Sequence, residues 1–178
     1  MGADADITIS RFSEDDIESH LHELGALLHA CVVDGANIGF VLPHTQADAE
    51  AFWSGKVLPA VRAGGLAVLI AHEGGRIAGT VQLDYDTMPN QRHRADVRKL
   101  LVHPELRRQG IARALMAEVE RLAGRLGRRL LTLDTRSGDP AERLYASLGF
   151  KTAGIIPGYC RDPFEDRLDP TTIMYKAL

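Results

Sequence analysis

The chain has 178 residues, of which 45% are hydrophobic and 25% charged, and a net charge of −3, as expected for one globular domain. These values exclude a disordered, collagen-like or coiled-coil chain, and the longest apolar run, Leu66 to Ala71, is far shorter than the roughly 20 residues of a membrane span. The first ten residues are acidic and lack an apolar core, so we expect no secretory signal. Cys31 and Cys160 are too few for a disulfide scaffold, and we predict a cytoplasmic protein with free thiols.

The N-terminal half is predicted to form a strand, two helices and a hairpin. Alternating apolar residues indicate the first strand, and the sequence Ser13-Glu-Asp-Asp resembles a helix N-cap. The glycines of residues 35–40 predict a loop, and Gly74-Gly75 predicts the tight turn of the hairpin. The expected elements are a strand at 7–12, helices at 13–33 and 46–62, and strands at 66–72 and 76–84.

The C-terminal half alternates strands and helices. Its clearest helix spans residues 110–126, where apolar residues repeat at helical spacing along one stripe. Strands are expected at 95–102, 130–134, 150–156 and 171–176, and a further helix at 140–148. The resulting order, β-α-α-β-β-β-α-β-α-β-β, predicts a mixed α/β sheet in one domain.

Charge is distributed unevenly along the chain. Residues 1–91 hold 4 basic and 13 acidic residues, whereas residues 92–129 hold 11 basic and 4 acidic residues. A basic segment in an acidic protein indicates a local anion site, although arginines after Arg113 also suit a solvated helix face. Nucleic-acid binding through this segment is a weaker alternative, because only 6% of residues are aromatic and could stack on bases. We therefore predict neither nucleic-acid nor membrane partners.

The segment from Leu100 to Ala112 joins a strand to a helix through a short turn. The first turn of a helix offers unpaired backbone N–H groups and a partial positive charge, and both suit phosphate. Gly110 has no Cβ to block a close approach, and Arg107 and Arg108 add positive charge. An ordinary strand-to-helix turn is the alternative. The motifs of nucleoside-triphosphate sites, dinucleotide sites, zinc proteases and serine hydrolases are absent from the sequence.

Two motifs resemble those of the GNAT acetyltransferase superfamily. The sequence RRQGIA at residues 107–112 is similar to its (R/Q)-x-x-G-x-(G/A) motif, and AERLYASLGF at residues 141–150 is similar to its A-x-x-x-Y-x-x-x-G-F helix. The order of elements also matches. The resemblance implies the GNAT fold over residues 1–178: a mixed, mostly antiparallel sheet of about seven strands with helices on both faces.

The resemblance also implies acetyl-CoA as the cosubstrate and no metal. The pantetheine arm would pair with one strand edge, and the pyrophosphate would lie on the backbone of the following loop. A backbone N–H near Leu101 would bond the thioester carbonyl. The residues expected to bind the cosubstrate are Leu100, Leu101, Val102, Arg107, Arg108, Gln109, Gly110, Ile111 and Ala112.

Catalysis is expected to be direct attack of an amine on the thioester, with the two reactants held in line. Tyr145 matches the family position of the acid that protonates the departing thiolate. Asp134, at the end of a predicted strand, is our candidate for the base, with water as the alternative. The alternative for Tyr145 is that it is an aromatic residue of the core. The alternative for Asp134 is that its carboxylate caps a helix or stabilises a turn.

The acceptor is expected to be a small-molecule amine. Residues 35–40, 133–135, 157–160 and 168–173 resemble the tabtoxin-resistance branch of the family, which implies an amino-acid-like toxin or antibiotic, but residues 162–166 depart from it. Asp34, Trp53 and Tyr159 are candidate acceptor-pocket residues, although packing or exposure explains each equally well.

Several alternatives remain open at this point. One alternative is a protein acetyltransferase that acts on a lysine or an N-terminus, for which an open, acidic acceptor cleft is expected. Another is a binding module that senses acetyl-CoA without catalysis. A monomer and a homodimer are both compatible with the sequence. His22 and His29 share a helix face without a third ligand, so we expect no metal there. We expect Cys160 to be an inert pocket thiol.

Overall fold

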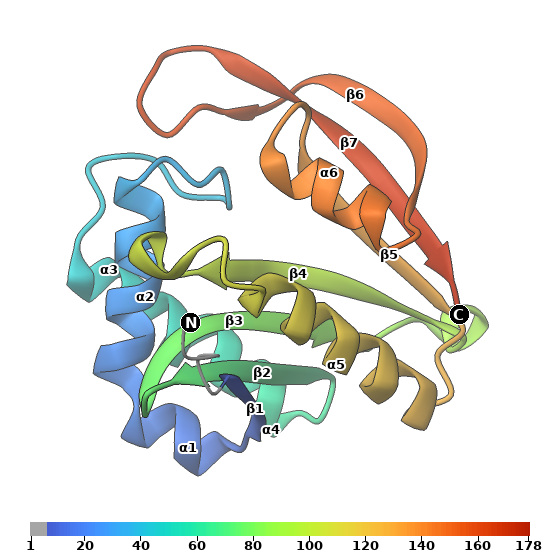
Figure 1. Cartoon of the computed structure of the whole chain (residues 1–178), viewed down its shortest axis with the longest axis horizontal. Coiled ribbons are helices and arrows are strands. Elements are labelled where there is room, and N and C mark those ends of the chain that lie inside the picture. The colour runs from blue at the N-terminus through green and yellow to red at the C-terminus, as the bar shows by residue number, and fades with distance from the viewer. Residues whose placement is uncertain (1–6) are drawn as a thin grey trace, which may run out of the picture.

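A computed structural model of the chain describes residues 7–178 (Figure 1). Residues 1–6, on which part of the prediction about a secretory signal rests, lie outside the described residues. Among residues 7–178, no helix combines the length and the apolar character needed to cross a bilayer.

The described residues form one sheet with the strand order β1-β2-β3-β4-β5-β7-β6. All neighbouring strands are antiparallel except β4 and β5, which are parallel. The strands are β1 (Ile7–Phe12), β2 (Leu66–Glu73), β3 (Arg76–Asp84), β4 (Arg94–Val102), β5 (Leu130–Arg136), β6 (Lys151–Arg161) and β7 (Leu168–Ala177). The helices are α1 (Glu14–Ser19), α2 (Leu21–Val33), α3 (Gln46–Phe52), α4 (Leu58–Arg62), α5 (Ile111–Arg125) and α6 (Pro140–Ser147). The predicted mixed, mostly antiparallel sheet is confirmed.

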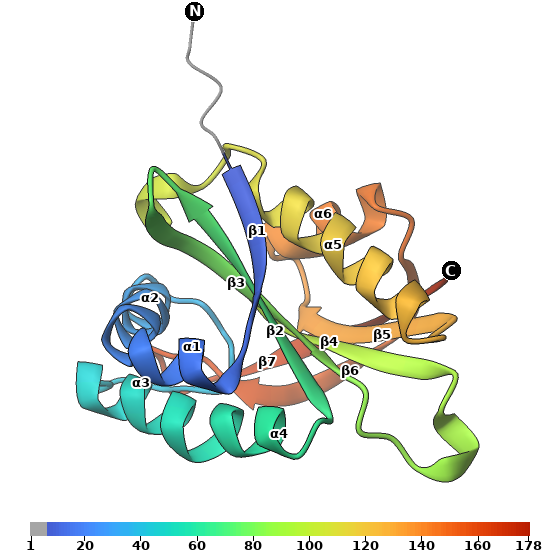
Figure 2. The same ribbon diagram turned by 90° about the horizontal axis from the view of Figure 1, so that it is seen from below.

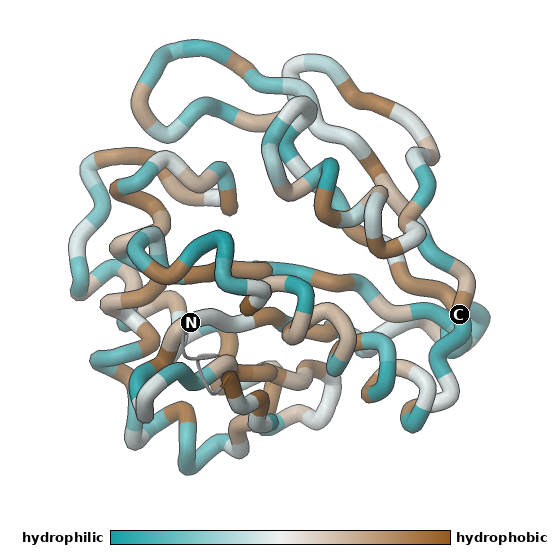
Figure 3. Tube along the Cα trace, in the orientation of Figure 1, coloured by the Kyte–Doolittle hydropathy of each residue, from teal (hydrophilic) through white to brown (hydrophobic). Residues whose placement is uncertain are grey.

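Helices cover both faces of the sheet, with α1–α4 on one face and α5 and α6 on the other (Figure 2). This explains the apolar run Leu66–Ala71 in β2, because successive strand residues point to opposite faces. Its even-numbered residues pack in the core beneath α1–α4, and its odd-numbered residues pack beneath α5. Hydrophilic residues gather in the loops and on the outer turns of the helices (Figure 3).

Both predicted N-terminal helices are interrupted. The first breaks at His20, whose ring Nδ1 lies 2.9 Å from the Asp16 carbonyl oxygen and competes for a helical acceptor. The second passes through a π-helical turn at Trp53–Val57 before α4. Pro59 follows directly and cannot donate the backbone hydrogen bond that a continuous α-helix requires.

The sheet opens between β4 and β5. The two strands pair only where Arg94–Asp96 lies beside Leu130–Thr132, and they diverge beyond that point (Figure 1). The later residues of β4 remain paired with β3 on their other side. Backbone N–H and C=O groups on the opened edge of β4 therefore lack a strand partner and are available to a ligand.

Candidate active site

A cavity of about 1100 Å³ lies where β4 and β5 diverge. Its lining comes from the α2–α3 loop (residues 34–45), the second half of β4, the loop that leads into α5, the end of β5, α6 and β6. The lining holds six arginines and one lysine but only three aspartates, so it is positively charged. It therefore suits an anionic ligand.

One end of this cavity, which we call the donor end, is formed by Leu100–Val102 and by residues 106–113. Leu100, Leu101 and Val102, which are predicted to bind the cosubstrate, line the cavity on the opened edge of β4. Most predicted residues of the loop also line it, including Arg107, Arg108 and Gly110, whereas Gln109 does not and its side chain is exposed.

The loop before α5 has the backbone shape of an anion cradle. Arg108 and Gly110 both adopt left-handed backbone conformations, with φ of 67° and 85°, and Gly110 is the N-cap of α5. No side chain caps this helix, and no acidic residue lies in its first turn. The N–H groups of the first turn are therefore unoccupied by protein acceptors and face a region where phosphate is electrostatically favoured.

Asp34 lies at the donor end of the cavity, and its carboxylate is already paired within the protein. Its carboxylate accepts a hydrogen bond from Arg107 at 2.5 Å, which connects the end of α2 to the loop before α5. Both side chains are 44% exposed. The predicted role of Asp34 in binding an ammonium group therefore competes with an existing ion pair.

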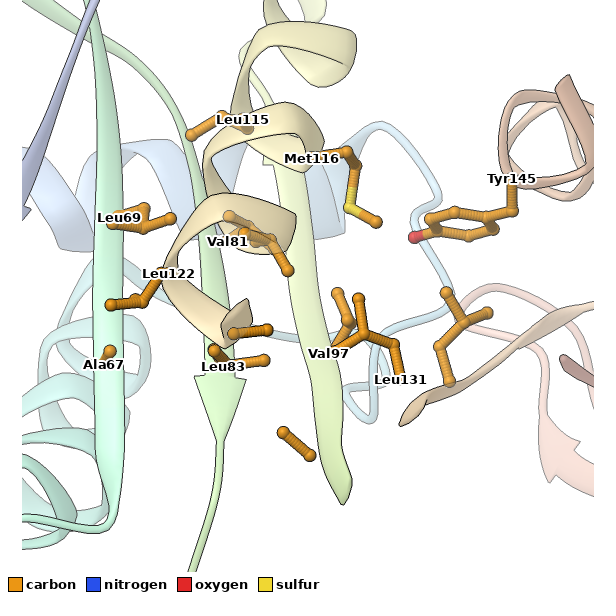
Figure 4. Close-up of a cluster of buried hydrophobic side chains, with 14 of the residues drawn as sticks. Ala67, Leu69, Val81, Leu83, Val97, Leu115, Met116, Leu122, Leu131 and Tyr145 are labelled. Carbon is orange, nitrogen blue, oxygen red and sulfur yellow. The ribbon is translucent and has the colours of Figure 1, made fainter. Parts of the chain in front are cut away.

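Tyr145 and Asp134 line the same cavity. The Tyr145 side chain projects from α6 toward the side of β4 and α5 (Figure 4), and the residue is 7% exposed. Burial, with a smaller contribution from the negative charge of Asp134, holds the pKa of Tyr145 well above its usual value near 10. Asp134 is exposed at the end of β5 and accepts a hydrogen bond from Thr171 Oγ1 at 3.3 Å. A protonated phenol and a carboxylate thus face one space.

We call the other end the acceptor end; it comprises residues 35–39, Lys99, residues 134–136, Tyr159 and Cys160. Tyr159, a candidate acceptor-pocket residue, lines it and is 52% exposed. Cys160 accepts a hydrogen bond from Asn37 Nδ2 at 3.2 Å, and burial raises the pKa of its thiol. Lys99 also lines this end. Neither Lys99 nor the Asn37 contact was predicted, because each depends on residues more than 60 positions apart.

Trp53 does not line the cavity, so its predicted place in the acceptor pocket is wrong. Its side chain is 1% exposed and packs in the core between α1–α4 and the sheet. Trp53 is the first residue of the π-helical turn and faces the sheet, so its indole does not reach the cavity.

The acceptor end is held by a network that sequence analysis also missed. Arg136 on β5 pairs with Asp139 at 2.9 Å, Asp162 at 3.2 Å and Asp169 at 3.4 Å. The β6–β7 loop (residues 162–167) contacts the α2–α3 loop directly, because Leu42 N donates to the Pro163 carbonyl at 3.0 Å. These contacts fix two loops together beside the cavity. Among residues 7–178, no three histidine, cysteine or acidic side chains form a metal site.

Comparisons with known proteins agree with this architecture. A family model described as an acetyltransferase (GNAT) domain matches residues 64–152. The fold resembles yncA of Salmonella typhimurium, solved with its cofactor acetyl-CoA, with 20% identity, a TM-score of 0.75 and coverage of 98% of this chain and 95% of yncA. It also resembles a ribosomal-protein-alanine N-acetyltransferase from Brucella melitensis, with 23% identity, a TM-score of 0.74 and coverage of 96% and 99%.

A third structure, named for phosphinothricin N-acetylation, is 19% identical, with a TM-score of 0.76 and coverage of 97% of this chain and 98% of that one. The family match spans half of this chain, and the chain belongs to the GNAT acetyltransferases. The predicted family, fold and enzyme class, an acyltransferase, are confirmed.

Proposed function

We propose that this acetyltransferase transfers the acetyl group of acetyl-CoA to the amine of a small molecule. The observation that carries the proposal is one cavity that joins an anion cradle, an opened strand edge, a buried phenol and a carboxylate. The donor end suits acetyl-CoA, because backbone N–H groups at the start of α5 meet the diphosphate and the edge of β4 meets the amide-bearing pantetheine arm. Acetyl-CoA in yncA supports the same donor.

The reaction in this proposal is direct attack. The amine nitrogen bonds to the thioester carbon, the carbon–sulfur bond breaks, and the sulfur leaves as a thiolate. A backbone N–H near Leu101 stabilises the negative charge on the carbonyl oxygen during attack. The amine proton passes to Asp134 or water, and Tyr145 supplies a proton to the thiolate.

The acid and the base influence each other electrostatically. The raised pKa keeps the Tyr145 phenol protonated at neutral pH, but it also makes proton transfer to the thiolate unfavourable in energy. When Asp134 accepts the amine proton, its negative charge disappears, and with it one of the two causes of the raised pKa. Deprotonation of the amine therefore favours the later protonation of sulfur.

The acceptor end favours a small molecule over a protein segment. Residues 34–42 are fastened to the β6–β7 loop, and Phe164 packs so closely against Gly35 that a Cβ there would lie 2.7 Å from its ring. Gly35 also has a φ of 91°, which other residues rarely adopt. The acceptor end holds Lys99 and Arg136 beside the single carboxylate of Asp134, which does not match the acidic cleft expected for a basic protein segment. The finer resemblance to toxin-resistance acetyltransferases stays a prediction.

The test combines calorimetry with a thiol-release assay. Acetyl-CoA should bind with micromolar affinity, and some members of a panel of small amines should release CoA, whereas lysine-containing peptides should not. Binding without turnover of any amine would make the protein a sensor, and preferred turnover of peptides would make it a protein acetyltransferase. Either result contradicts the proposal.

A further inference from the structure

Lys99 occupies an irregular position on β4. A bulge places Lys99 and Leu100 opposite the single residue Val81, because Arg98 pairs with Gln82 and Leu101 pairs with Thr80. The bulge reverses the alternation of the strand: Val97 packs in the core beneath α5, but Leu101 packs in the core beneath α1–α4. Lys99 itself has a φ of 50°, a left-handed conformation that is strained for a residue with a side chain.

Lys99 lines the acceptor end, and its ammonium group is held against the α2–α3 loop. Its Nζ donates a hydrogen bond to the Ile38 carbonyl at 2.7 Å and lies 5.8 Å and 5.7 Å from the ring centres of Phe40 and Phe52. These contacts orient a partly buried cation, and burial lowers the pKa of Lys99. Within residues 7–178, no carboxylate lies within ion-pair distance of this group.

Arg136, the other cation of the acceptor end, and Arg98, which precedes Lys99 on β4, already have anionic partners. Arg98 pairs with Asp84 at 2.7 Å, and Arg136 pairs with three aspartates. A partly buried cation without a counter-ion is unfavourable unless a ligand supplies one. Among the described residues of this end, Lys99 is thus the cation that an anionic ligand would meet.

Asp134 supplies the opposite charge on the same cavity. Its charge acts on Lys99 across the space, but the two side chains form no direct ion pair in the described structure. The acceptor end therefore presents a positive group, Lys99, and a negative group, Asp134, that are not paired with each other. This pattern complements a molecule that carries an amine and an anionic group at the same time.

We infer that the acceptor is an amino acid or a related zwitterion whose carboxylate, or equivalent phosphinate or phosphonate, binds Lys99 while its amine faces Asp134. This inference rests on the proposed function and narrows its acceptor class. The bound anion accepts a charge-assisted hydrogen bond from Nζ and gives Lys99 the counter-ion that the protein does not provide. Lys99 acts as a specificity-determining residue and takes no part in the proton transfers.

The test compares L-amino acids with their carboxamides, which keep the amine but lack the anionic group. The wild-type enzyme should prefer the free acids by about 100-fold in kcat/KM, because the amides leave Lys99 without a counter-ion. Lys99→Met should remove most of this preference by lowering kcat/KM for the acids alone, and Lys99→Arg should restore part of it. Lys56→Met, which alters an exposed lysine outside the cavity, is the matched control.

Three outcomes would overturn the inference. Equal use of acids and amides by the wild-type enzyme would contradict it and leave the proposed function intact. An equal loss of both activities in Lys99→Met, with an unchanged melting temperature, would assign Lys99 a structural role at the Ile38 carbonyl. Absence of turnover with every amine, despite acetyl-CoA binding, would remove the proposed function together with the inference.

Discussion

The two ends of the cavity are built from different parts of the chain. At the donor end, one continuous segment from β4 through the loop into α5 supplies mostly backbone groups. At the acceptor end, side chains from the α2–α3 loop, β4, β5 and β6 come together from distant positions. A backbone site depends on conformation and tolerates many side chains, whereas a side-chain site changes with each substitution. The comparison explains how one fold can keep its donor while its acceptor varies.

The largest effect on catalysis is expected at Tyr145, which lines the cavity that contains both ends. Tyr145→Phe removes the phenolic proton but leaves the ring packed beside Phe150, so kcat should fall about 100-fold with little change in KM or melting temperature. Because the pKa of Tyr145 is raised, wild-type activity should not decline through ionisation of this group as pH rises to about 10. Steady-state kinetics from pH 6 to pH 10 measure both effects, with Tyr175→Phe as the control. Unchanged kcat in Tyr145→Phe would exclude the proposed acid.

A smaller and pH-dependent effect is expected at Asp134. Asp134→Asn removes a base but keeps a similar side-chain volume near Thr171, so kcat/KM should fall about tenfold at pH 6.5. The loss should shrink as pH rises, because more of the amine then arrives already neutral. If the loss of kcat/KM were the same at every pH, Asp134 would contribute to binding the acceptor and would not act as the base.

The ion pair between Asp34 and Arg107 connects the end of α2 to the loop before α5 and provides a finer test. Asp34→Asn should change stability by less than about 1 kcal/mol, because both side chains are 44% exposed. It should also free the Arg107 guanidinium for phosphate, so the dissociation constant of acetyl-CoA should fall several-fold. Calorimetry measures this change, and weaker binding would show that Arg107 needs Asp34 to hold its position.

The smallest effect concerns stability near the acceptor end. His44 is buried with both ring nitrogens unpartnered, and burial is the main cause that lowers its pKa below 6.5. The unfolded chain therefore takes up a proton first, and His44 destabilises the fold as pH falls below about 6.5. The urea concentration at the midpoint of unfolding should fall less between pH 7.5 and pH 5.5 for His44→Phe than for wild type. An exposed-site control, His93→Gln, should behave like wild type.

Sequence analysis succeeded where local patterns determine the structure. Apolar alternation located β1, the Gly74-Gly75 turn located the hairpin of β2 and β3, and a single apolar stripe located α5 within one residue at each end. The donor loop could be proposed from the sequence because a glycine at a helix start has a local sequence signature. The prediction ended β6 too early, at residue 156, because Pro157 and Gly158 normally stop a strand, but an edge strand accommodates them at an irregularity in its pairing with β7.

The acceptor end could not be predicted from local patterns. The bulge at Lys99 depends on pairing with β3, and the Arg136 network joins β5 to residues 162–169. The error at Trp53 has the same origin, since the burial of its side chain depends on the packing of α1–α4 against the sheet. Each feature is set by contacts between residues far apart in the chain.

The measurement that tests the account most directly is calorimetric titration of acetyl-CoA into the Gly110→Glu variant. A side chain at a φ of 85° strains the cradle, and its negative charge repels the diphosphate, so affinity should fall at least about 100-fold. Gly124→Glu places the same side chain in open space farther along α5 and should bind acetyl-CoA as wild type does. Equal affinity of wild type and Gly110→Glu would contradict a donor site at the start of α5.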